Sequence, residues 1–95
     1  MKKTLKIGPF IYKVEEVENL TSVRIDGEES QCHGIIDPRK ELIQIEKNDS
    51  PTGKQIDLWH EILHALCWQY GVAWKDEDID RIAHGVVDVI NSNKL

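Results

Sequence analysis

The sequence predicts an α+β fold, in which a small antiparallel sheet of about three or four strands is followed by two packed helices. Apolar and polar residues alternate in the first half of the chain, as they do in half-buried strands. Residues 51–70 and 76–91 instead carry apolar residues at helical spacing. The order of these patterns, strands first and helices second, is typical of α+β proteins and predicts a helical layer packed on one sheet.

The composition limits the chain to a few classes of protein. Its 95 residues predict a single domain, residues 1–95, and its 40% hydrophobic and 31% charged residues are typical of a globular protein. The net charge of −5 makes a nucleic-acid partner unlikely, because no stripe of Lys and Arg is present to neutralise phosphates. Since there is no membrane span or signal-peptide core, we expect a cytoplasmic protein with no membrane partner and with Cys32 and Cys67 as free thiols.

The N-terminal third is expected to be extended. Residues on one side of the predicted strand alternate with residues on the other: Phe10, Tyr12 and Val14 against Ile11, Lys13 and Glu15. Gly8-Pro9 separates this strand from a short apolar lead-in at residues 5–7. Residues 18–31 are polar, with a turn signal at Asp26-Gly27 and an apolar pair at Val23 and Ile25, so we expect a connection with at most one short strand.

Residues 31–47 predict a β-hairpin. Its arms are residues 32–36 and 42–46, and Asp37-Pro38-Arg39-Lys40 joins them. Proline at the second position of this turn pre-sets φ for a type I turn. On the second arm Ile43 and Ile45 share the face that we expect to be buried. We expect this arm to be an edge strand, where an extended peptide could add through backbone hydrogen bonds.

Two helices follow the hairpin. Asp49 or Ser50 is expected to cap the first, Pro51 suits its first position, and Gly71 is a natural stop. Apolar residues lie on two sides of this helix, so we expect it to be covered on both. The second helix, residues 76–91, has acidic residues in its first turn and a predicted buried stripe of Ile79, Ile82, Ala83, Val86 and Ile90.

The first helix contains the segment His60-Glu61-Ile62-Leu63-His64, an H-E-x-x-H motif. Residues four apart lie on one face of a helix, so His60 and His64 can offer two imidazoles to one metal ion. Glu61 can then reach a water bound to that ion. In zincins this motif holds Zn²⁺ through the histidines and uses the glutamate as a general base. A chance pairing of two core histidines is the alternative, but the capped helix and the uncharged neighbours of the motif favour a metal site.

The chain contains the segments 59–66 (WHEILHAL) and 79–85 (IDRIAHG), with Tyr70-Gly71 between them. Together these segments resemble the small zincin-like metallopeptidases of phages and prophages, which are related to the ImmA/IrrE-type gluzincins. The resemblance extends over residues 30–92. It implies a zinc metallopeptidase in which a sheet precedes the active-site helix and a later helix supplies a carboxylate ligand. Larger zincins place a further helix before the hairpin, so this chain would be a minimal version acting on a peptide or protein, such as a phage or host regulator.

The resemblance places the third zinc ligand at Asp76 and a supporting polar residue at Asp80, counted back from Ile82-Ala83. The family has Glu at the ligand position, and Asp shortens the reach by one methylene. At helical spacing Asp76 lies roughly 50° from the centre of the apolar stripe, Asp80 about 90° and Glu77 about 150°. A role for Asp76 as a helix cap and for Glu77 as the ligand remain alternatives.

Other polar residues are weaker candidates. Cys67 lies one turn beyond the motif, but a small buried residue is its more typical role. Cys32 and His33 are adjacent on the predicted strand and should point to opposite faces. His84 either orients a ligand or lies on the surface. The aromatic residues around the helices are expected in the core: Trp59, Trp68, Tyr70 and Trp74.

Three functions are compatible with these patterns. The first is a zinc metallopeptidase with Glu61 as the base and His60, His64 and Asp76 as metal ligands. The second is a zinc-binding interaction or regulatory module without turnover. The third is a small zinc-dependent hydrolase of another substrate, such as RNA, which the acidic composition disfavours.

Overall fold

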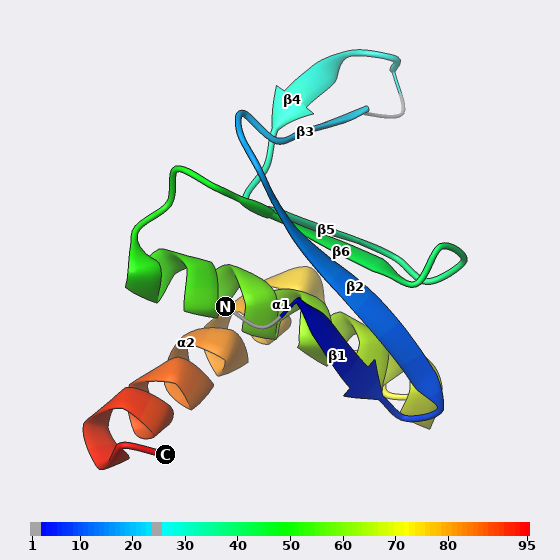
Figure 1. Ribbon diagram of the computed structural model, residues 1–95. Coiled ribbons are helices and arrows are strands. Elements are labelled where there is room, and N and C mark those ends of the chain that lie inside the picture. The colour runs from blue at the N-terminus through cyan, green and yellow to red at the C-terminus, as the bar shows by residue number, and fades with distance from the viewer. Residues whose placement is uncertain (1–2, 24–25) are drawn as a thin grey trace.

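The computed structural model describes residues 3–23 and 26–95 and confirms the α+β fold (Figure 1). A four-stranded sheet lies on one side of helix α1 (Pro51–Tyr70), and helix α2 (Asp76–Asn93) lies on the other. The strands of this sheet, in spatial order, are β1 (Thr4–Ile7), β2 (Phe10–Val17), β6 (Leu42–Glu46) and β5 (Gly34–Asp37). Neither helix of the described chain is long and apolar enough to cross a bilayer.

The sheet is mixed rather than antiparallel throughout. β1 pairs with β2, and β5 with β6, in antiparallel register, but β2 and β6 run parallel, with Val14 opposite Ile43. The chain leaves β2, returns as β5 in the opposite direction, and then folds back as β6 into the space between β2 and β5. The predicted antiparallel sheet is therefore wrong for this central pair, because β6 inserts beside a strand that is distant in sequence.

The same topology corrects the predicted edge strand. β6 has β2 on one side and β5 on the other, so its backbone groups are paired in both directions. The edges of the sheet are β1 and β5. The hairpin itself is confirmed, and its turn is stabilised by Asp37 Oδ1, which accepts hydrogen bonds from the backbone N–H groups of Arg39 at 3.0 Å and Lys40 at 3.2 Å.

The described part of residues 18–31 contains two short strands, whereas at most one was expected. β3 (Thr21–Val23) and β4 (Glu29–Gln31) form a separate two-stranded antiparallel sheet that projects from the main sheet (Figure 1). Glu46 at the end of β6 anchors its base, accepting a hydrogen bond from the Leu20 N–H at 2.7 Å. Val23 is exposed, and its predicted apolar partner Ile25 lies outside the described residues.

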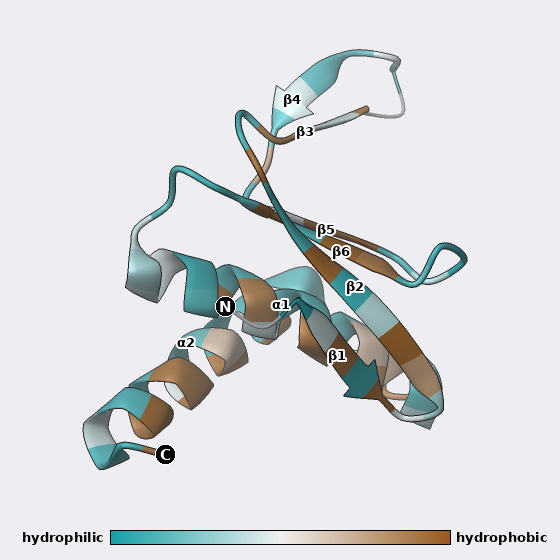
Figure 2. Ribbon diagram, viewed as in Figure 1, coloured by the Kyte–Doolittle hydropathy of each residue, from teal (hydrophilic) through white to brown (hydrophobic). Residues whose placement is uncertain are grey.

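Helix α1 is central, as its two apolar sides predict. Figure 2 shows apolar residues along β2, β5 and β6 and on both helices. The sheet side of α1 packs through Leu58, Ala65 and Leu66 on a core that contains Tyr12, Val14, Ile43 and Ile45. The opposite side packs through Leu63 and Cys67 on Ile79 and Ala83 of α2. The helix is thus held between two apolar layers, which fixes the orientation of the polar residues on its remaining face.

The ends of α1 are determined locally. Ser50, rather than Asp49, is the N-cap, and its Oγ accepts a hydrogen bond from the Gly53 N–H at 3.0 Å. Pro51 is the first helical residue, and Gly71 ends the helix in the left-handed conformation, with φ of 67°. These contacts confirm the predicted bounds.

The outer surface of the helices differs from the prediction in two ways. The buried stripe of α2 is centred on Ile79, Ala83 and Val87, while Ile82 is 43% exposed. Three of the four aromatic residues predicted in the core are exposed: Trp68, Tyr70 and Trp74. Trp68 lies beside His64 on the polar face of α1, and Tyr70 and Trp74 lie at the connection between the helices, so all three lie outside the two buried clusters.

Candidate metal centre

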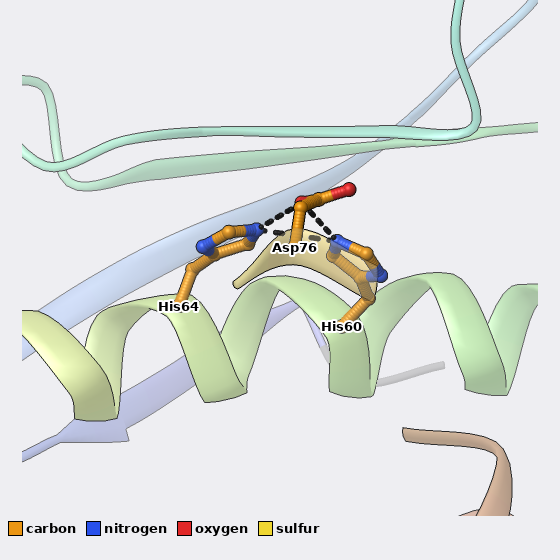
Figure 3. Close-up of side chains that lie close together, drawn as sticks. All are labelled: His60, His64 and Asp76. Atoms are coloured by element: carbon orange, nitrogen blue, oxygen red, sulfur yellow. Dashed lines mark hydrogen bonds and ion pairs between the residues drawn. The ribbon is translucent and has the colours of Figure 1, made fainter. Parts of the chain in front are cut away.

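Three potential metal ligands converge between the helices (Figure 3). His60 and His64 project from the same face of α1, and Asp76 reaches over them from the first turn of α2. Asp76 Oδ1 lies 3.0 Å from His60 Nε2 and 2.9 Å from His64 Nε2, and the two Nε2 atoms are 3.2 Å apart. Ligands about 2.0–2.2 Å from one tetrahedral ion would lie roughly 3.3–3.5 Å from each other. The observed separations are close to that spacing, so the three side chains could hold one metal ion.

The packing of α2 explains why Asp76 reaches the histidines. Ile79, 1% exposed, and Ala83 are buried against Leu63 and Cys67 of α1, which brings the start of α2 beside the motif. Lys75 is the N-cap of α2, so Asp76 is the first helical residue and the alternative role of a cap is wrong.

The acidic neighbours of Asp76 have different surroundings. Glu77 is exposed and is not part of the group of ligand atoms within 4.8 Å of one another. Asp80 lies one turn further along α2, where its Oδ1 is 3.3 Å from His60 Nδ1. A hydrogen bond from His60 Nδ1–H to Asp80 would leave the Nε2 lone pair free for a metal. Asp80, which the resemblance predicts as a supporting residue, therefore contacts a histidine of the motif.

Hydrogen bonds in the cluster favour an ionised Asp76. Burial raises the pKa of this carboxyl, but hydrogen bonds from His60 and His64 outweigh that effect and bring its pKa below the usual value. An ionised carboxylate is the form that binds a cation.

Glu61 is buried between α1 and the sheet, with 6% of its surface exposed. Burial raises its pKa to about 7, the charge of His60 opposes the shift, and Asp76 adds to it. Gly34, the first residue of β5, lies directly against it: a Cβ built on Gly34 would be 3.1 Å from Glu61 Oε1 and 3.2 Å from Glu61 Cγ. Glycine at this position therefore provides the space that the glutamate occupies.

These groups share a cavity of about 410 Å³. It is lined by His60, Glu61, His64 and Asp76. Cys32 and His33 line it too, although their side chains bond to different partners, the Leu20 carbonyl and Asp49. Both residues precede β5 and are not part of the strand, so strand alternation does not apply to them. A larger hollow of about 750 Å³ lies beside Leu58 and includes neither Glu61 nor His64.

Two other candidate residues lie apart from the ligand group. Cys67 is buried among apolar side chains of both helices and is not among the clustered ligand atoms. His84 Nδ1 donates a hydrogen bond to the backbone carbonyl of Asp80 at 2.8 Å and contacts no motif histidine in the described hydrogen bonds. The more typical role expected for Cys67, that of a small buried residue, is confirmed.

Gly34 and Asp57 were not among the predicted site residues. Gly34 lies in a strand that contacts α1 across a sequence separation of 27 residues, and Asp57 precedes the motif by one turn and lines the same cavity. No local spacing marks either residue. Their roles follow from the packing of β5 on α1, and a glycine in a predicted strand was the only available signal, since it indicates a close approach.

Comparisons with protein-family models, with curated proteins and with solved structures give no match. The resemblance to the ImmA/IrrE-type zincins thus stays a prediction that rests on the two quoted segments.

Proposed function

We propose that the protein is a zinc-dependent metallopeptidase, in which His60, His64 and Asp76 hold one Zn²⁺ ion and Glu61 is the general base. The convergence of three ligand atoms from two helices, in a cavity that a buried glutamate also lines, carries the proposal. Two imidazoles and one carboxylate fit the donor set of a catalytic zinc site, which keeps one position open. Zn²⁺ bound there would polarise the substrate carbonyl and acidify water.

The chain's own contribution to hydrolysis would be proton transfer by Glu61. Its carboxyl group lies one residue from His60 and lines the cavity, and its pKa of about 7 places both protonation states near neutral pH. Glu61 would be ionised beside a cation, which is the form that a base needs. It would accept a proton from the attacking water and then donate it to the leaving amine.

The free edge of β5 is the proposed place for the substrate backbone. Among the described residues this strand pairs with β6 alone, and its first residue contacts Glu61. An extended peptide could add along the outer edge through backbone hydrogen bonds and pass close to the cavity. The proposed peptide site therefore moves from β6 to β5. We place the activity in the cytoplasm, since both cysteines are free thiols.

The test is an assay of zinc-loaded full-length protein on a mixture of unrelated peptides, with products identified by mass spectrometry. We expect cleavage that a chelator abolishes and added zinc restores. His64→Ala should be inactive, and His84→Ala, which changes an exposed histidine outside the cluster, should retain activity. Zinc binding without cleavage of any peptide would favour the interaction module, and zinc-dependent cleavage of RNA alone would favour the other hydrolase.

The contributions of the acidic residues to zinc affinity should follow their contacts. Asp80→Ala is expected to weaken zinc binding about 10–100-fold, as the loss of a residue that orients a ligand does. Asp76→Ala should weaken it more, and Glu77→Ala should leave it unchanged. Competition with a chromophoric chelator measures the three dissociation constants. A loss in Glu77→Ala as large as that in Asp76→Ala would contradict the proposed ligand set.

Gly34→Ala should impair catalysis without removing zinc. The added Cβ would approach Glu61 Oε1 to 3.1 Å, so the carboxylate must shift by a few tenths of an ångström. Misplacement of a reacting group is costly, and we expect kcat to fall about tenfold with zinc affinity retained. Gly85→Ala is the matched control, because a Cβ there meets nothing within 4 Å. Equal kcat values for the two variants would show that this contact does not position Glu61.

A further inference from the structure

A second group of potential ligands lies beside the histidine cluster and belongs to none of the roles above. His33 precedes β5, Asp49 precedes α1, and Asp57 lies within α1. One ligand atom from each residue lies within 4.8 Å of the others, and His33 Nδ1 is 2.9 Å from Asp49 Oδ2. Three separate segments of the chain thus bring an imidazole and two carboxylates together.

The surroundings of Asp57 bear on what this group could hold. Its Oδ2 is buried and has no hydrogen-bond partner among the described residues. Burial raises the pKa of Asp57 to about 8, and the adjacent Asp49 carboxyl adds to the shift. Lys54, the lysine whose charge acts on Asp49, is instead paired with Glu16 through a contact of 2.6 Å. Two facing carboxyl groups in this setting need a shared proton, the charge of a protonated His33 or a bound cation.

The position and chemistry of the group fit a cation. Imidazole nitrogen and carboxylate oxygens together suit divalent ions such as Zn²⁺ and Mn²⁺. His33 and Asp57 also line the cavity that contains Glu61, and Asp57 lies one helical turn before Glu61 on α1. An ion held by these residues would therefore face the same cavity as the first site.

We propose that His33, Asp49 and Asp57 form a second divalent-cation site, next to the site formed by His60, His64 and Asp76. The proposal does not depend on peptidase activity, because it concerns residues outside the H-E-x-x-H motif. The alternative explanation of this group is a proton shared between Asp49 and Asp57, with His33 paired to Asp49.

Asp57→Asn separates the two explanations. The carboxamide keeps the shape of the side chain and can donate a hydrogen bond to Asp49, so it reproduces a protonated Asp57. It removes, however, an anionic ligand. Under the shared-proton explanation the variant should lose no metal, whereas under the proposal it should lose one ion per chain. Asp88→Asn, an exposed change on α2, is the matched control.

The measurement is equilibrium dialysis of the full chain against Zn²⁺ alone, followed by elemental analysis, with Mn²⁺ as a second probe. We expect two ions per chain for the wild type and for Asp88→Asn, and one each for Asp57→Asn and His64→Ala. If Asp57→Asn does not fold, His33→Ala, which changes a largely exposed side chain, gives the same readout.

The result also separates this proposal from the proposed function. One ion that is lost in His64→Ala and retained in Asp57→Asn and His33→Ala would overturn the second site. One ion that is lost in Asp57→Asn and retained in His64→Ala would support the second site and overturn the zinc centre of the peptidase.

Discussion

Glu61→Gln is expected to abolish peptide hydrolysis while the zinc content stays at the wild-type value. The amide has nearly the same shape as the carboxyl group, but it cannot accept a proton from water. Loss of a general base typically costs about 10²–10⁴-fold in rate. Steady-state kinetics on a peptide that the wild type cleaves, together with elemental analysis of the same sample, measure both properties.

A matched control for this variant is Glu77→Gln, which makes the same chemical change on the exposed start of α2. It should have wild-type kcat and zinc content. Wild-type activity in Glu61→Gln would exclude the glutamate as the base, whatever metal is bound. Loss of zinc together with activity would instead mean that Glu61 maintains the geometry of the site rather than transferring a proton.

Removal of the metal should lower the melting temperature by more than about 10 °C. The proposed ion joins α1 to α2 through His60, His64 and Asp76, and binding to the folded state alone adds several kcal/mol by mass action. In a domain of this size each kcal/mol corresponds to about 4–8 °C. Thermal unfolding followed by circular dichroism, with zinc and with excess chelator, measures the difference.

Two variants identify the origin of that change. His64→Ala should melt near the temperature of the chelated wild type and respond less to chelator. Asp57→Asn retains the first site, so the response that remains in this variant belongs to the ion between the helices. A thermal transition of the wild type that chelator leaves unaltered would show that no metal stabilises the fold.

The sequence by itself determined the local features of this protein. The bounds of α1 were predictable because Ser50, Pro51 and Gly71 act on backbone groups within a few residues of themselves. The shared face of His60 and His64 follows from helical spacing alone. The position of Asp76 beside the motif was predictable from the resemblance to the zincins and from the apolar stripe of α2. The stripe was only partly correct, because the buried stripe includes Val87 and leaves Ile82 exposed.

Only the tertiary structure decided how distant segments meet. A hairpin pattern specifies that β5 pairs with β6, but it does not specify whether another strand pairs with the other edge of β6. Here β2 occupies that other edge. The contact between Gly34 and Glu61 depends in turn on the placement of β5 over α1. The group of His33, Asp49 and Asp57 likewise has no sequence spacing to reveal it, because packing between three segments creates it. Local periodicity and capping act over about four residues, whereas strand order and shared cavities depend on burial across the whole chain.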